Sequence, residues 1–352
     1  MKQLPLFPTS VCGSMPRTQF VLDLISGGSD PDAYERRMRN AVAYVAAMQE
    51  EAGLDVITDG EWGRKSYIGV IAELAHGFEL STNPADGRPW TVVTEKLAPK
   101  KTGFIATEVK RLRALTDRAI KATLPAPALL GERMWDAEKS RKAYPTRDDF
   151  VRATVPILRA EVEQLRDAGA DIVQIDDPHL CLFVDPAVRA NYDDADAASH
   201  FSVDMVNEVV DGIPNVKFAV HLCRRAGARV RGEEQHAGGY DPILEQLNRL
   251  KVHHLTMEWT APGAGDMAVL SQLRSDFEIG LGCVSVHPGQ VDSAKTIVAR
   301  VKGALQHLDK ERITLNPDCG FAPGSAAKVS LDEVYQKLKN EVEAARCLRE
   351  KY

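Results

Sequence analysis

The sequence predicts an α/β protein of the (β/α)8 class, a TIM barrel, formed as a single domain by residues 1–352. Two observations favour this class: short apolar runs alternate with longer helical patterns, and polar residues gather where the apolar runs end. With 352 residues, of which 44% are hydrophobic and 27% charged, the chain suffices for one large barrel or two ordinary domains. The alternative is an open, doubly wound sheet, because one of the expected units is weak.

Short apolar runs bounded by polar or turn-forming residues indicate the strands. The expected strands are residues 10–14, 54–61, 122–130, 170–177, 216–223, 253–258, 278–287 and 312–319. Longer patterns between them predict the helices. The expected helices are residues 32–52, 147–168, 199–210, 240–250, 266–274, 292–308 and 331–350.

Two stretches fit this alternation poorly. Residues 122–130, the third expected strand, contain Pro125 and Pro127, and proline cannot donate a hydrogen bond to a sheet. Residues 67–101 carry proline, glycine and asparagine, which predicts an irregular excursion over one face of the barrel. The eightfold pattern is weakest at these two places.

Composition excludes several classes of partner. The net charge of −6 argues against a nucleic-acid-binding surface, which would require a basic patch. No apolar run is long enough to span a bilayer, and residues 1–8 lack the apolar core of a signal peptide. The six cysteines are widely spread, as in a reduced protein whose thiols are buried or bind a metal. We therefore expect a cytoplasmic protein that binds neither nucleic acid nor membrane.

The fifth expected strand ends in two residues that commonly bind metals, His221 and Cys223. Residues i and i+2 of a strand point to the same side, so both side chains can hold one ion. Zinc is the ion that most often accepts both imidazole and thiolate. The alternative for this stretch alone is a core histidine beside a buried thiol.

Polar residues occur at or just beyond the carboxyl ends of the expected strands. In a barrel these ends share one face, where such enzymes place their chemistry. Solvated loop residues would instead be scattered over both ends of the barrel. The sequence therefore predicts an active site drawn from Ser14, Asp59, Glu61, Asp176, Asp177, His221, Cys223, Glu258, His287, Asp318 and Cys319.

Two further residues of this set complete a metal site. Glu258 ends the sixth expected strand and Cys319 ends the eighth. With His221 and Cys223 they supply one nitrogen, two sulfurs and one oxygen, a tetrahedral set suited to zinc. Because a long carboxylate can leave the metal, a substrate thiol can take its place and become a thiolate at neutral pH. The alternatives are a solvated charge at position 258 and a buried thiol before a glycine turn at position 319.

The remaining acids of the set predict an amine site. Glu61 and Asp176 can hold an ammonium group through charge-assisted hydrogen bonds, and Ser14 with nearby backbone N–H groups can hold a carboxylate. Together they describe a pocket for an amino-acid zwitterion whose side chain carries sulfur. The alternative is that the acids cap strand ends or form salt bridges with Arg17 or Arg64.

His287 ends the seventh expected strand, at the same mouth. The ordinary pKa of histidine suits proton delivery to a leaving group, which predicts a catalytic role as general acid. The alternative is a histidine that only hydrogen-bonds a loop.

The order of these motifs resembles the cobalamin-independent methionine synthases, specifically their C-terminal catalytic barrel, over nearly the whole chain. The matching segments are residues 13–17, 59–64, 174–178, 221–223, 257–258, 286–287 and 316–320. The resemblance implies methyl transfer from a methylated folate, 5-methyltetrahydropteroyltri-L-glutamate, to a zinc-bound homocysteine thiolate, giving methionine. It implies that the zinc ligands are His221, Cys223, Glu258 and Cys319. It also implies that homocysteine is bound by Ser14, Glu61 and Asp176, with His287 as the proton donor.

Departures from the family pattern leave the substrates open. Full-length synthases carry a second, N-terminal barrel; this chain is closer in size to single-barrel relatives, for which a corrinoid protein is the alternative methyl donor. The basic segment 224–231 is instead similar to relatives such as epoxyalkane:coenzyme M transferase, where zinc activates a different thiol. Residues 259–263 likewise replace the polar segment expected in a synthase. A second alternative is a non-catalytic barrel that stores zinc or has a regulatory role.

Overall fold

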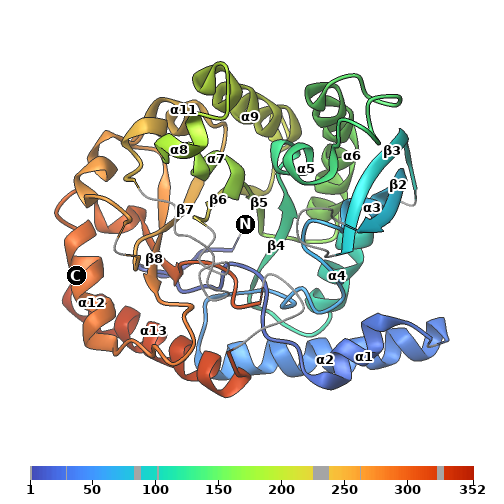
Figure 1. Ribbon diagram of the computed structural model, residues 1–352. Coiled ribbons are helices and arrows are strands. Elements are labelled where there is room, and N and C mark those ends of the chain that lie inside the picture. Colours follow the sequence, from blue (N-terminus) through green and yellow to red (C-terminus); the bar gives the residue numbers. More distant parts are fainter. Residues whose placement is uncertain are drawn as a thin grey trace.

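The computed structural model describes residues 2–28, 30–82, 89–100, 103–224, 238–261, 263–322 and 329–352. Seven parallel strands form a curled sheet in the order β1-β4-β5-β6-β7-β8-β9, and helices surround it (Figure 1). The strands are β1 (Val56–Ile57), β4 (Ala119–Pro125), β5 (Ile172–Asp176), β6 (Lys217–Leu222), β7 (His254–Glu258), β8 (Glu278–Val284) and β9 (Ile313–Pro317). The predicted strand-then-helix alternation is therefore confirmed for these seven units.

The segment before residue 14 lies between the two edge strands of the sheet. Thr9 forms a parallel bridge with Leu315 of β9, and Ser10 forms one with Val56 of β1. The Ser10 N–H donates to Leu315 O at 3.0 Å, and the Val56 N–H donates to Thr9 O at 3.0 Å. A strand over residues 10–14 was expected, but the described residues show only these isolated bridges, because the chain turns away to carry Ser14 toward the mouth.

The third expected strand is wrong at both ends. Strand β4 begins at Ala119 and ends at Pro125, and helix α5 (Pro127–Met134) follows at once. Pro127 stands in the first turn of α5, where proline is favoured because that position needs no intrahelical donor. The second proline therefore starts a helix instead of interrupting a strand.

The expected irregular excursion over residues 67–101 is largely ordered. It contains helix α3 (Ile71–Leu74) and an antiparallel ribbon of β2 (Ala75–Thr82) and β3 (Pro89–Pro99). The ribbon lies at the outer edge of the molecule near α5 and α6 (Figure 1). Phe78 of β2 packs edge-on against Phe150 of α6, with ring centroids 6.1 Å apart. This contact gives the ribbon an apolar attachment to the helical layer.

The longer predicted helices are confirmed, and side-chain caps begin two of them. Asp30 accepts from the Ala33 N–H at the start of α2, and Thr146 and Asp149 form a capping box at the start of α6. The remaining helices include several short ones that the sequence pattern did not predict. The helices are α1 (Gln19–Ser26), α2 (Pro31–Ala52), α3 (Ile71–Leu74), α4 (Phe104–Arg113), α5 (Pro127–Met134), α6 (Arg147–Asp167), α7 (Pro178–Leu182), α8 (Pro186–Arg189), α9 (Ala195–Val210), α11 (Leu244–Arg249), α12 (Ala294–Ala304) and α13 (Leu331–Lys351), with 3-10 turns at Asp241–Ile243, Met267–Gln272 and Lys310–Arg312.

The region expected to be a helix over residues 266–274 is a 3-10 helix over Met267–Gln272. Asp266 caps it by accepting from the Ala268 N–H at 2.9 Å. None of the helices in the described ranges is both long and apolar enough to cross a membrane.

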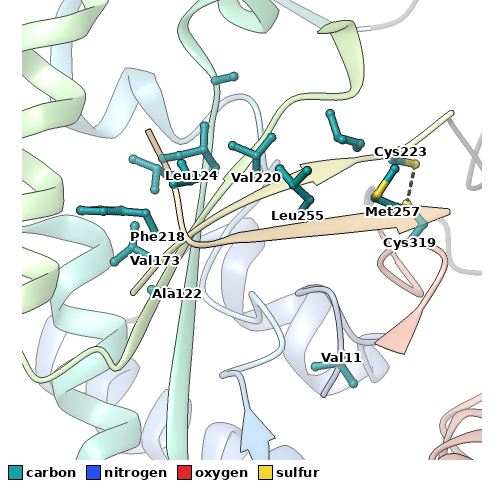
Figure 2. Packing of buried hydrophobic residues seen from close by; sticks show 14 of the residues in the cluster. Val11, Ala122, Leu124, Val173, Phe218, Val220, Cys223, Leu255, Met257 and Cys319 are labelled. Atoms are coloured by element: carbon teal, nitrogen blue, oxygen red, sulfur yellow. Dashed lines mark hydrogen bonds between the residues drawn. The ribbon is translucent and has the colours of Figure 1, made fainter. Parts of the chain in front are cut away.

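Alternation along the strands separates an apolar layer from the site. Phe218 and Val220 of β6 are buried with Leu255 of β7 in the hydrophobic core (Figure 2). His221, the residue after Val220, points to the opposite side of β6. It faces the enclosed side of the curled sheet, where groups from non-adjacent strands can meet.

Candidate functional site

Two cysteine thiols from distant parts of the chain meet at the carboxyl ends of the strands. Cys223 directly follows β6, and Cys319 lies two residues after β9. Their Sγ atoms are 3.0 Å apart, and both residues are buried (Figure 2). Because β7 and β8 separate β6 from β9 in the sheet, the thiols can approach only across the enclosed side.

His221 adds a nitrogen ligand to this pair. The ligand atoms of His221, Cys223 and Cys319 all lie within 4.8 Å of one another. His221 Nδ1 is 3.1 Å from Asp176 Oδ1, the kind of carboxylate contact that orients a metal-bound imidazole. One imidazole and two thiols at this spacing fit a soft, tetrahedral ion such as zinc.

The electrostatics of the thiol pair also fit a cation. The hydrogen bond that the Cys223 thiol donates to Cys319 Sγ, together with burial, raises the pKa of Cys223 well above its usual value. Two adjacent buried thiols cannot both ionise without a compensating positive charge. A divalent metal supplies that charge and stabilises both thiolates.

Glu258, the expected fourth ligand, stands beside this group but outside it. Glu258 ends β7, is fully buried, and has its Oε2 atom 4.0 Å from Cys223 Sγ. The same oxygen accepts from the Arg224 backbone N–H at 3.0 Å. The Tyr240 hydroxyl accepts from Glu258 N at 2.9 Å and donates to Glu258 O at 3.2 Å. The main chain of Glu258 is thus held on both sides, while its carboxylate lies next to the thiols.

Arg224 does not behave as the start of an exposed basic segment. Its side chain is buried, donates to Gly263 O at 2.5 Å and Ala264 O at 3.1 Å, and lies over the Tyr240 ring with its Cζ atom 4.4 Å from the centroid. The Arg224 side chain therefore connects the end of β6 to the segment that follows Glu258. The rest of that segment, residues 225–231, lies outside the described residues.

Asp318 joins the ends of β7 and β9. Its Oδ1 accepts from the backbone N–H groups of Trp259 at 2.9 Å and Thr260 at 3.0 Å. Burial, reinforced by the negative charge of Glu258, raises the pKa of Asp318 to about 7. The hydrogen bonds of Asp318 to Trp259 and Thr260 hold the neighbouring Cys319 at a fixed position relative to Glu258.

Glu61 occupies a strained turn just after β1. It has a φ of 57°, a conformation that side-chain-bearing residues rarely adopt and that recurs at functional sites. Its Oε1 accepts from the Thr123 hydroxyl at 2.8 Å. Gly13 adjoins the same oxygen, and a Cβ there would lie only 2.6 Å from Glu61 Oε1. The carboxylate is therefore bound by Thr123 and lies next to a position that only glycine can fill.

The expected alternative partners of Glu61 do not pair with its carboxylate within the described residues. Arg17 Nη2 donates to the backbone carbonyl of Glu61 at 2.7 Å, and Arg64 forms a buried ion pair with Glu108 at 2.8 Å. Burial raises the pKa of Glu61, with a further increase from the negative charge of Asp176 and an opposing effect of Arg64. Two neighbouring buried carboxylates of this kind attract a cation.

Ser14 reaches the same mouth. Its Oγ accepts from the Ala322 N–H at 3.2 Å, and its carbonyl accepts from the Phe321 N–H at 3.0 Å. Gly320 lies so close to the Ser14 hydroxyl that a Cβ there would collide with it. Ser14 is thereby fixed beside the turn that carries Cys319.

His287, the expected proton donor, follows β8. It is exposed, and its hydrogen bonds within the described residues involve its backbone. Its N–H donates to Ser285 Oγ at 3.2 Å, and its carbonyl accepts from Lys337 Nζ at 2.7 Å. Its role as proton donor remains a prediction.

Sequence reasoning did not find Thr123, Tyr240 or Tyr67. Tyr67 belongs to the predicted excursion, yet burial, with the negative charges of Asp176, Cys223 and Cys319 adding to it, raises the pKa of its hydroxyl. Thr123 lies within the third expected strand, and the structure places it in β4, where it pairs in register with Gln174 of β5. Its position in a strand was therefore predicted, but its contact with Glu61 was not.

The fold and this group together define an α/β protein that gathers an imidazole and two thiols at the carboxyl ends of its strands. The family model described as "Cobalamin-independent synthase, Catalytic domain" matches residues 7–347, and the chain belongs to this family. The expected family resemblance is thereby confirmed.

Relatives and solved structures agree with this assignment. A methionine synthase of Saccharolobus islandicus (strain L.S.2.15 / Lassen #1) is 27% identical over 359 residues, which cover 99% of this chain and 97% of that protein. The structure of a B12-independent methionine synthase from Shewanella sp. W3-18-1 in complex with selenomethionine has a TM-score of 0.80 at 19% identity, over 99% of both chains. The structure of a putative vitamin-B12 independent methionine synthase from Listeria monocytogenes has a TM-score of 0.75 at 22% identity, also over 99% of both chains. At these identities the two structures establish the shared fold.

Proposed function

We propose that this protein is a zinc-dependent methyltransferase that transfers a methyl group to the thiol of homocysteine, forming methionine. The observation that carries the proposal is the convergence of His221, Cys223 and Cys319 to within 4.8 Å. Membership of the cobalamin-independent synthase family supports the reaction class. The bridges of Thr9 and Ser10 support closure of the sheet into one eight-unit catalytic barrel.

In this proposal the four protein ligands are His221, Cys223, Cys319 and Glu258. When bound, zinc lowers the pKa of a coordinated substrate thiol and so provides a thiolate nucleophile. Glu258 is the ligand suited to leave, because its carboxylate already has a second partner in the Arg224 backbone N–H. The thiols and the imidazole stay in place, held by strand ends and by the Asp176 contact.

The amine site favours homocysteine over coenzyme M as the acceptor. Glu61 and Asp176 are both buried, and the negative charge of Asp176 acts on the Glu61 carboxylate. An ammonium group is attracted to such a pair, whereas the sulfonate of coenzyme M would be repelled. Ser14, fixed beside the turn that carries Cys319, is placed to receive the carboxylate end of the amino acid.

The methyl donor is a methylated folate, with a methylcorrinoid as the alternative. Release of a folate nitrogen as an anion is very unfavourable, so the folate reaction requires an acid, and His287 is the proposed group. A methylcorrinoid leaves as a metal-centred species and needs no such proton. The donor therefore decides whether His287 has a catalytic role.

A cobalt-substituted form of the protein tests the proposal. Addition of homocysteine should change the sulfur-to-metal absorption, because a new thiolate joins the metal, and coenzyme M should change it much less. A response to coenzyme M alone would favour the alkyltransferase alternative. No response to either thiol would contradict thiol activation and favour a storage role.

A further inference from the structure

We propose that Thr123, backed by the buried Arg64–Glu108 ion pair, is a positioning residue that sets the direction and charge of Glu61 for recognition of the substrate ammonium group. The inference rests on the proposed function and deepens it. Nothing in the family assignment or in the sequence motifs singles out Thr123 for this role.

A continuous series of buried hydrogen bonds runs from Glu108 through Arg64 and Thr123 to Glu61. Glu108 Oε2 accepts from Arg64 Nε at 2.9 Å and from Nη2 at 2.8 Å. Arg64 Nη1 then donates to Thr123 Oγ1 at 3.1 Å, and Thr123 Oγ1 donates to Glu61 Oε1 at 2.8 Å. All four residues are at most 4% exposed. Water therefore does not compete for these hydrogen bonds.

The order of donors fixes which way the Thr123 proton points. A guanidinium has only donors, so Arg64 must use a lone pair of the Thr123 oxygen. The single hydroxyl proton is then available for Glu61, which accepts it best as an ionised carboxylate. Arg64 and Thr123 both lower the pKa of Glu61 and so oppose the effect of burial. The relay thus favours the charged form that an ammonium group needs.

Strand register places this relay beside the other acid of the amine site. Thr123 pairs with Gln174, and Pro125 pairs with Asp176, in the parallel ladder between β4 and β5. Gly13 adjoins both partners: a Cβ at this position would lie 2.6 Å from Glu61 Oε1 and 3.1 Å from Thr123 Cγ2, so only glycine leaves room for their hydrogen bond. The hydrogen bond from Thr123 therefore holds the Glu61 carboxylate next to the strand that adjoins β5, and the negative charge of Asp176 at the end of β5 acts on it.

Loss of the Thr123 hydroxyl should impair recognition of the amine alone. Thr123 is placed to contact Glu61 and not the reacting sulfur, so a thiol without an ammonium group should be unaffected. The matched thiol is 4-mercaptobutanoic acid, which is homocysteine without its amino group. A purely structural role for Thr123 would weaken the binding of both thiols together.

The test measures the dissociation constants of both thiols by calorimetry on the zinc-loaded protein, for the parent, Thr123→Val and Thr123→Ser. Thr123→Val should weaken homocysteine binding about tenfold or more, as expected for a lost hydrogen bond to a charged group, and change 4-mercaptobutanoate binding less than about twofold. Thr123→Ser keeps the hydroxyl and should restore the parental affinity. Homocysteine binding by Thr123→Val should also recover as pH rises, because Glu61 then ionises despite a higher pKa.

The outcomes separate two kinds of failure. Equal losses for both thiols, or no loss for either, would overturn the role of Thr123. If the parent itself binds the two thiols equally well, the proposed amine site is wrong, and the role of the Arg64–Thr123–Glu61 hydrogen bonds in amine recognition is wrong as well. Should Thr123→Val not fold, Thr123→Ala replaces it, because it also lacks the hydroxyl and introduces no additional methyl group at that position.

Discussion

The two sides of the mouth are built in different ways. On the metal side, His221 and Glu258 belong to regular strands, and Cys223 directly follows one. On the amine side, Glu61 has a φ of 57°, and Ser14 lies beyond isolated bridges, outside any strand. A metal centre needs fixed ligand directions, which a parallel ladder provides. An amine pocket needs two carboxylates brought together against their mutual repulsion, and a strained turn supported by neighbours can do that.

This difference predicts how the two sides respond to substitution. Ligand replacement on the metal side should remove the ion while the strands persist. Replacement on the amine side should change substrate affinity while the ion is retained. Asp176 connects the two sides, because it contacts His221 and acts electrostatically on Glu61.

The largest effect is expected from replacing either thiol. Cys223→Ser and Cys319→Ser should each lose most of the bound zinc, because a hydroxyl is a poor zinc ligand compared with a thiolate. Metal analysis of the purified proteins measures this loss. Cys347→Ser, at the exposed cysteine, is the control and should keep one zinc per chain. Full zinc retention in both variants would contradict the assignment of Cys223 and Cys319 as metal ligands.

His287→Gln should have the next largest effect, provided that the donor is methylfolate. Turnover with methylfolate should fall about 10²–10⁴-fold, and turnover with methylcobalamin should change little. Assays of the parent and the variant with both donors measure the difference. Parental turnover of the variant with methylfolate would leave His287 as an exposed loop residue with no part in the reaction.

Asp176→Asn tests the connection between the two sides. Loss of one charge-assisted contact costs about 1.5–3 kcal/mol, so the KM for homocysteine should rise about ten- to a hundredfold. Zinc affinity should fall as well, because the orienting partner of His221 is weakened. Steady-state kinetics and competition with a chelator measure the two effects. Asp211→Asn, at an exposed acid, should change neither; a rise in KM with unchanged zinc affinity would assign Asp176 to the amine side alone.

Tyr240→Phe should produce the smallest change. It removes the two hydrogen bonds to the backbone of Glu258 and leaves a buried N–H without its partner, which costs about 1–3 kcal/mol in the free energy of unfolding. Denaturant unfolding of the zinc-loaded proteins measures this cost. Tyr34→Phe, at a partly exposed tyrosine, is the comparison and should stay close to the parent. An unchanged stability would show that Glu258 is held without Tyr240.

The metal side was the more predictable from sequence, for a physical reason. The i, i+2 spacing of His221 and Cys223 suffices to place both side chains on one face of β6. Strand ends in a parallel sheet share an edge, which brings Cys319 to the same place. The amine side depends on the φ of Glu61 and on the close approach at Gly13, and neither follows from a hydrophobic pattern.

Contacts between distant segments decide two further features that the sequence pattern did not predict. The exposure of His287 depends on the path of the chain after β8, where Lys337 of α13 holds its carbonyl from 50 positions away. The ribbon of β2 and β3 was missed because its residues are only partly buried and give no clear alternation. In both cases tertiary packing decided a local conformation that sequence periodicity left open.

The segment around Thr9 and Ser14 also bears on how the protein is made. Ser14 bonds to Ala322, 308 positions along the chain, and Cys12 donates to Pro317 O across 305 positions. At a synthesis rate of roughly 5–20 residues per second, the early segment waits about 15–60 seconds for these partners. Cys319 leaves the ribosome at nearly the same late moment. The proposed metal site is therefore complete only after translation of almost the whole chain, so the ribosome sets the earliest time at which these ligands can meet around an ion.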